Sequence, residues 1–157
     1  MDGLISLWLA RKSRDGQHWH EKGNRSKLAL KKWAESSLWT FENNWYLLEA
    51  EDSYCNNDFD TAKLFYEKAI TSAKDHKFVH EEALAYELAA YFYLEVGDTD
   101  KAMQYFLLAH EKYHDWGAFG KCDCLFKFVQ GRFSSSSVGA DHFVSTQAKN
   151  MTNERTT

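Results

Sequence analysis

The feature that most constrains the fold of this chain is an internal repeat with a period of forty residues. Residues 45–70 resemble residues 85–110 when the two stretches are laid over each other. The matching pairs are Tyr46/Tyr86, Leu48/Leu88, Ala50/Ala90, Asp58/Asp98, Asp60/Asp100, Ala62/Ala102 and Ala69/Ala109, with aromatic residues matched at Phe65/Tyr105 and Tyr66/Phe106. Small residues and aromatic residues in this order are typical of helix–turn–helix repeats. The repeat therefore predicts stacked helical hairpins, which most often bind other proteins.

Composition agrees with an all-helical chain. The 157 residues are 44% hydrophobic and 16% aromatic, and they include no proline. A chain of this length buries about two-thirds of its unfolded surface, so one packed domain is expected. Cys55, Cys122 and Cys124 are odd in number and follow no disulfide framework. They indicate a reduced intracellular protein, and we expect a cytoplasmic location.

Charge is unevenly distributed along the chain. Residues 1–36 carry eight basic and four acidic residues, whereas residues 37–130 carry eight basic and seventeen acidic residues, a net charge of −9. An acidic body disfavours nucleic acid as a partner, because phosphate contacts need positive faces. It favours a protein partner with a basic surface, although a solvated helical face has the same composition. No apolar run reaches the ~20 residues of a spanning helix, so no membrane partner is expected.

Hydrophobic spacing and capping signals predict the helices. The predicted ranges are 2–12, 17–36, 40–56, 59–76, 80–96, 99–115 and 119–130. Asp58 and Asp98 are predicted N-caps, and Asn57 and Gly97 are predicted turn residues. We expect residues 1–36 to cap the stack, residues 37–130 to hold the repeats and a capping helix, and residues 131–157 to form a disordered tail.

The repeat is of the tetratricopeptide type, so the predicted fold is an all-α stack of antiparallel helical hairpins, an α-α superhelix. Its period exceeds the usual period of about 34 residues. We expect residues 75–80, where the two hairpins join, to absorb the extra length. By the usual repeat geometry, six residues are predicted to face a concave groove and bind a partner: Leu47, Glu51, Tyr54, Glu87, Tyr91 and Leu94. Aromatic anchors with an acidic rim are typical of protein interfaces, while core packing is the alternative for each residue.

Several segments resemble one specific helical region. These are Leu30–Ser36 (LKKWAES), Trp45–Ala50 (WYLLEA), His76–Ala90 (HKFVHEEALAYELAA) and Trp116–Ala118 (WGA). Over roughly residues 28–128 the chain is similar to the tetratricopeptide-like segment of large multidomain sensor kinases. In that family the segment follows a serine/threonine-kinase-like domain and an ATPase module, and it precedes a GAF domain and a histidine kinase or cyclase output.

The resemblance implies a non-enzymatic connector or adaptor for protein partners or neighbouring signalling domains. None of the family's catalytic motifs occurs in the chain: it has no Gly-rich phosphate loop, no kinase catalytic loop and no phospho-accepting histidine box. We therefore expect no cofactor and no enzymatic activity. The alternative is a structural fragment of a larger sensor kinase or cyclase that has no independent function.

An enzymatic alternative comes from His110-Glu111-Lys112-Tyr113-His114, which matches the H-E-x-x-H pattern of zinc hydrolases. Two histidines four residues apart share one helix face, and the intervening glutamate could activate a zinc-bound water. An extended version of the motif needs a third ligand at position 120, where this chain has glycine. We therefore expect no metal site, and two polar residues near the end of a repeat helix as the simpler interpretation.

Overall fold

The computed structural model describes residues 2–133, and within that range every regular element is an α-helix. The helices are α1 (Asp2–Lys12), α2 (Gly16–Ser36), α3 (Leu38–Cys55), α4 (Phe59–Asp75), α5 (Val79–Glu95), α6 (Thr99–Asp115) and α7 (Phe119–Phe133). The predicted all-α fold is confirmed. The boundaries of the first six helices lie within two residues of the predicted ones.

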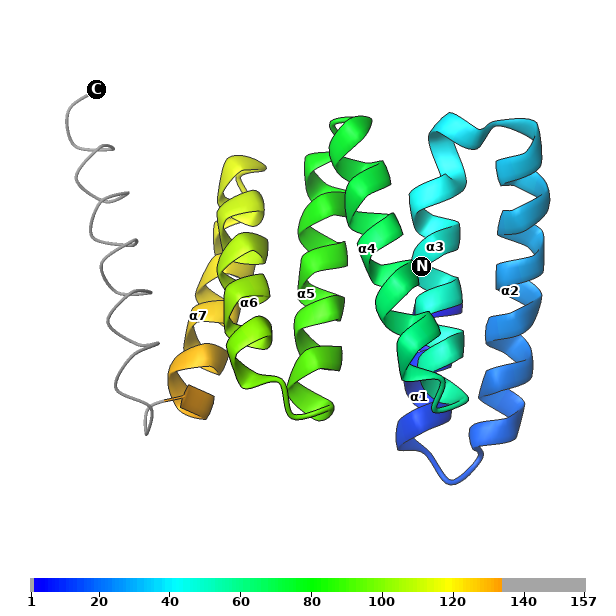
Figure 1. Ribbon diagram of the computed structural model, residues 1–157, viewed down its shortest axis with the longest axis horizontal. Helices are drawn as coiled ribbons and strands as arrows, with labels where there is room; N and C mark the ends of the chain where they lie inside the picture. The colour runs from blue at the N-terminus through cyan, green and yellow to red at the C-terminus, as the bar shows by residue number, and fades with distance from the viewer. Residues whose placement is uncertain (1, 134–157) are drawn as a thin grey trace.

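The helices form antiparallel hairpins that stack side by side along the long axis of the molecule (Figure 1). Helices α1 and α2, α3 and α4, and α5 and α6 make three hairpins, and α7 packs on α6 at the far end. Helix α1 also contacts α3, and α3 contacts α5, so these helices share one side of the stack. Residues 2–36 thus form a hairpin of their own that extends the stack before the first repeat.

One turn geometry joins all the helices from α3 to α7. Three residues separate successive helices, and the middle residue of each turn has positive φ. These middle residues are Asn57, Lys77, Gly97 and Gly117. The N–H of the third turn residue bonds to the carbonyl five positions earlier, as in Asp58 N to Ser53 O at 2.9 Å. This is the bond of the Schellman motif, which satisfies carbonyls left open at a helix C-terminus.

The origin of the forty-residue period differs from the expectation. The join between Asp75 and Val79 has the same three-residue turn as the others, so the prediction that residues 75–80 absorb extra length was wrong. Helices α4, α5 and α6 have 17 residues each. The extra length therefore lies inside the helices, which are regular because their apolar faces are buried along the full length.

The predicted caps and core positions are confirmed. Asp58 Oδ1 accepts a bond from Thr61 N at 3.2 Å, and Asp98 Oδ1 accepts one from Lys101 N at 3.1 Å. The shared repeat positions form the centre of the core and are at most 1% exposed: Ala50, Ala62, Tyr66, Ala69, Ala90, Ala102, Phe106 and Ala109. The alanines allow close approach of helices, and the two rings fill the space between hairpins.

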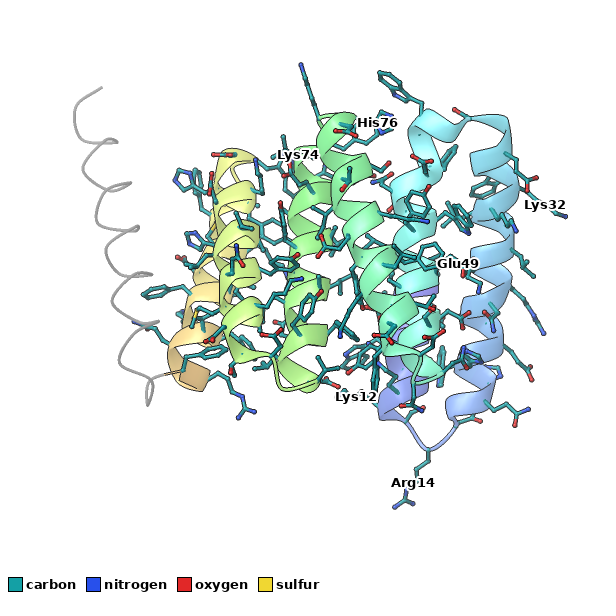
Figure 2. The ribbon with its side chains drawn as sticks, in the orientation of Figure 1. Lys12, Arg14, Lys32, Glu49, Lys74 and His76 are labelled. Carbon is teal, nitrogen blue, oxygen red and sulfur yellow. The ribbon has the colours of Figure 1, made fainter. Side chains whose placement is uncertain are left out.

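The basic first segment pairs with the acidic body. Lys27 of α2 bonds to Glu49 of α3 at 3.1 Å and also to Asp52. Figure 2 shows Glu49 between the two helices, whereas Arg14 and Lys32 point away from the stack. The basic first segment of the chain therefore neutralises part of the acidic charge for which a basic partner was expected.

Helix α7 ends later than predicted. It continues through Gly131 to Phe133, because the Phe133 ring is buried with its centroid 6.5 Å from that of Phe106. The prediction that residues 131–133 belong to a disordered tail was wrong, and the rest of the predicted tail, residues 134–157, lies outside the described part of the chain. Among the described helices, none is long and apolar enough to cross a membrane.

Candidate functional site

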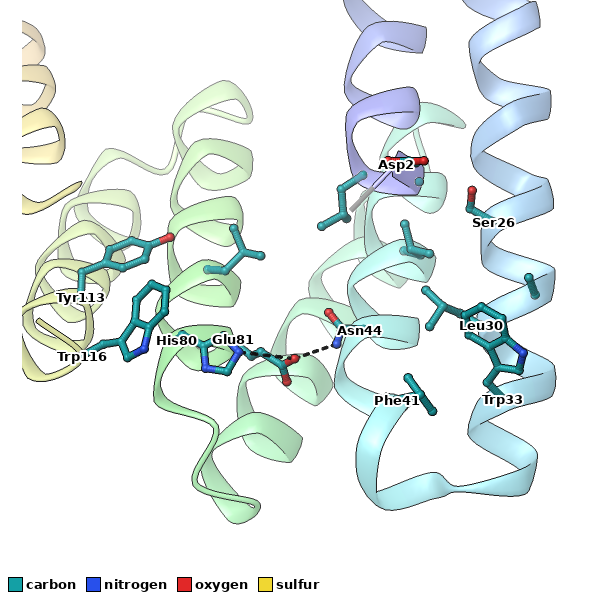
Figure 3. A pocket seen from close by; sticks show the side chains of 15 residues that line it. Asp2, Ser26, Leu30, Trp33, Phe41, Asn44, His80, Glu81, Tyr113 and Trp116 are labelled. Atoms are coloured by element: carbon teal, nitrogen blue, oxygen red, sulfur yellow. Dashed lines mark hydrogen bonds and ion pairs between the residues drawn. The ribbon is translucent and has the colours of Figure 1, made fainter. Parts of the chain in front are cut away.

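A pocket of about 620 Å³ opens among α1, α2, α3, α5 and the end of α6 (Figure 3). Its lining is mostly apolar and includes Leu30 and Trp33 of α2, Phe41 and Leu48 of α3, Leu84 of α5, and Trp116 just after α6. Trp33 and Trp116 are 57% and 56% exposed. A pocket of this size and character is large enough for side chains of a bound molecule. We call it the Trp33–Trp116 pocket.

The pocket lies beside the first residues of α1, with α2 and α3 on one side and α5 and the end of α6 on the other. At the start of α1, Gly3 lies so close to Leu48 and Ser26 that an added Cβ would be 2.9 Å from each of them. The later part of α2 and the earlier part of α3 extend beyond α1, and their side chains line the pocket (Figure 3).

Glu81 is the central charged group of the pocket. Its carboxylate accepts a bond from Asn44 Nδ2 at 2.9 Å and another from the amide of Asn43. His80 Nε2 lies 3.8 Å from the same carboxylate, and the His80 ring lies against Trp116 with centroids 5.2 Å apart. Within residues 2–133, no lysine or arginine forms an ion pair with Glu81. Two neutral amides therefore hold a carboxylate whose charge stays available.

The six residues predicted to face a groove do not line this pocket. Leu47, Glu51, Tyr54 and Glu87 are buried, and Tyr91 and Leu94 are partly buried against the core. The prediction that these residues form one accessible surface was therefore wrong. The pocket uses Leu48 in place of Leu47, and one residue along a helix turns the side chain by about 100°. The usual repeat geometry thus gave the wrong face.

Glu51 belongs to a buried cluster beneath α1. Arg11 Nη1 donates to one Glu51 oxygen at 2.5 Å, and the Tyr66 hydroxyl donates to the other at 2.6 Å. The Arg11 guanidinium also lies 4.3 Å from the ring centroid of Tyr54. Burial, together with the charge of Glu51, raises the pKa of Tyr66. The predicted groove residues Glu51 and Tyr54 therefore fasten α1 to the stack.

Glu87 has a similar internal role at the other end. The Tyr113 hydroxyl of α6 donates to Glu87 at 2.7 Å, and Lys121 Nζ of α7 donates to it at 2.8 Å. The ring of Tyr91 packs against Phe106 and Phe128 with centroid distances of 5.1 and 5.2 Å. These contacts hold α5 to α6 and α7.

The H-E-x-x-H segment lies near the end of α6. His110 is 5% exposed, and burial, with a smaller effect of the nearby His114, lowers its pKa. The His114 ring packs against Phe119 with centroids 5.4 Å apart. In the described part of the chain, no three His, Cys, Asp or Glu side chains are placed to hold a metal ion together.

Sequence reasoning missed the pocket. Its lining comes from five helices, and no local pattern predicts how those helices meet.

Comparisons with protein-family models, with curated proteins and with solved structures find no match for this chain. The function is therefore argued from the geometry and chemistry of the pocket.

Proposed function

We propose that this chain is a non-enzymatic protein-interaction or interdomain connector module, which holds a segment of a protein partner or of a neighbouring signalling domain in the Trp33–Trp116 pocket. The observation that carries the proposal is the pair of half-exposed tryptophans on an apolar pocket built by five helices. Tryptophan is enriched among the residues that dominate binding energy at protein interfaces. Contiguous apolar surface rimmed by polar groups marks interaction sites.

Two further observations support a role in signalling and a cytoplasmic location. The resemblance to the helical segment of multidomain sensor kinases favours a connector between signalling domains. The three cysteines are all free thiols, which favours a reducing compartment, and we place the protein in the cytoplasm.

The test compares the Trp33→Ala/Trp116→Ala double variant with Trp39→Ala. Trp39 is 65% exposed and does not line the pocket, so it is a matched control for loss of an exposed indole. Quantitative capture of cross-linked proteins from cells should show partners that the double variant loses and that Trp39→Ala keeps. Circular dichroism of each variant verifies the helical fold. Recovery of the same proteins in the same amounts by the double variant would contradict the proposal.

A further inference from the structure

We infer that the occupant of the Trp33–Trp116 pocket is a cationic amphipathic helix, which packs on α2 and α3 beside the first residues of α1. This inference rests on the proposed function and specifies the chemistry of the partner. Three observations carry it: the aromatic side chains on two sides of the pocket, the absence of backbone partners on helical walls, and the charge of the lining.

Aromatic side chains stand on two sides of the pocket. Figure 3 shows α1 beginning at Asp2, with α2 and α3 continuing along the pocket. Trp33 and Phe41, with ring centroids 5.8 Å apart, stand on the α2–α3 side, and Trp116 stands on the α6 side. A helix there would pack on α2 and α3 as α1 does.

A helix suits this pocket better than an extended segment. The walls are themselves helices, whose backbone N–H and C=O groups are bonded within each helix. An extended segment would bring unpaired backbone groups against apolar side chains, which is costly. A helix satisfies its own backbone and presents apolar side chains at i, i+3, i+4 and i+7 on one face.

The charge of the pocket selects a cationic partner. The described residues that line it include two carboxylates, Asp2 and Glu81, and neither lysine nor arginine. Where α1 covers the stack, Glu51 of α3 is neutralised by Arg11 of α1 at 2.5 Å. Glu81 of α5 has only the neutral amides of Asn43 and Asn44 and the nearby His80. A lysine or arginine on the occupant would form with Glu81 the kind of ion pair that Arg11 forms with Glu51.

The experiment uses two synthetic, covalently stapled helical peptides as probes. One carries leucines on one face and a lysine beside them, and the other replaces that lysine with glutamate. Binding to the full chain is measured by isothermal titration calorimetry, and the site is located by methyl NMR. We expect shifts at Leu30, Leu48 and Leu84 with the lysine peptide. We expect affinity to fall roughly tenfold or more for the glutamate peptide, and likewise for the lysine peptide with Glu81→Gln.

Several outcomes would overturn the inference. Equal affinity for both peptides, or undiminished affinity of the Glu81→Gln variant for the lysine peptide, would show that charge does not select the occupant. Methyl shifts confined to the exposed Ile5 of α1 would place the helix elsewhere. Self-association in sedimentation experiments that Trp33→Ala abolishes would make a second copy the occupant.

The result also separates this inference from the proposed function. Partners that are lost with Trp33→Ala/Trp116→Ala but kept with Glu81→Gln, together with no binding of either peptide, would leave the proposed function standing and refute the cationic helix. Loss of no partner with either variant would refute the proposed function itself.

Discussion

Two glutamates on neighbouring helices of the same side of the stack have opposite surroundings. Glu51 of α3 is 3% exposed and bonds to Arg11 and Tyr66, whereas Glu81 of α5 bonds to two asparagine amides and faces the pocket. The difference arises because Arg11 of α1 lies over Glu51, whereas no lysine or arginine among the described residues pairs with Glu81. Where the chain covers its own face, it supplies the opposite charge, and at the pocket an apolar lining and a carboxylate stay accessible.

Tyrosine hydroxyls donate hydrogen bonds to the buried glutamates. Tyr66 donates to Glu51 at 2.6 Å, and Tyr113 donates to Glu87 at 2.7 Å, each between two helices. A buried carboxylate is tolerated only when its oxygens are bonded, and each hydroxyl meets that need while its ring fills the core. Glu81 has no tyrosine donor among the described residues. The covered and open carboxylates are therefore expected to respond differently to substitution and to pH.

Removal of α1 should have the largest effect on stability, because it exposes the part of the stack that α1 covers. A chain beginning at Ser13 lacks Leu7, which is fully buried, and exposes Leu48 of α3, against which Gly3 of α1 lies. We expect the free energy of unfolding to fall by roughly 5 kcal/mol. Urea denaturation followed by circular dichroism measures the change, with Trp8→Ala, an exposed position on the same helix, as the control. An unchanged midpoint would show that α1 does not stabilise the stack.

Glu51→Gln should have the next largest effect. It leaves the Arg11 guanidinium, whose side chain is 16% exposed, without its carboxylate. Breaking one side of a buried ion pair costs about 3 kcal/mol. The triple variant Arg11→Met/Glu51→Leu/Tyr66→Phe removes the ion pair and its hydroxyl donor together and should recover most of that loss. Equal stability of Glu51→Gln and the wild type in urea would refute the view that the covered glutamate needs its charge.

Alkaline pH should weaken the covered side. Burial first, and the adjacent glutamates second, raise the pKa of Tyr66 and Tyr113, and burial and Glu87 raise that of Tyr91 to about 12. In the unfolded chain a tyrosine pKa is about 10. Above that pH the unfolded chain loses protons that the folded chain keeps, so stability is fully present below about pH 10 and falls as pH rises.

Urea denaturation between about pH 8 and about pH 11 measures this decline. Tyr66→Phe removes one titrating group, so its decline should be shallower than that of the wild type although its stability at neutral pH is lower. Parallel declines for the two proteins would show that the Tyr66–Glu51 bond does not cause the alkaline loss.

Glu81→Gln should have the smallest effect on stability. Asn44 can still donate to the oxygen that the new side-chain amide retains, and Asn43, whose Oδ1 accepts no bond, can turn its own amide to accept one. We expect a change in the free energy of unfolding below about 1 kcal/mol in urea. A loss as large as that of Glu51→Gln would mean that Glu81 is a structural group, and the contrast between the two glutamates would disappear.

The local features of this chain follow from its sequence. The seven helices, the caps at Asp58 and Asp98 and the turn residues Asn57 and Gly97 were all predicted, because each depends on residues within one turn of one another. Lys77 was not predicted as a turn residue, since a lysine with positive φ carries no compositional signal. The alanine and aromatic positions of the repeat also gave the core correctly.

The facing of the helices and the site were decided by the tertiary structure. A shift of one residue rotates a side chain by about 100°, and the usual repeat geometry placed Leu47 and Glu51 on a groove although packing buries them. The pairing of Glu51 with Arg11 joins residues forty positions apart, and no local pattern predicts it. The pocket itself depends on how five helices pack against one another, with Gly3 of α1 close to Ser26 and Leu48. Local sequence thus determined which segments are helical, and packing between distant segments determined which of their surfaces stay open.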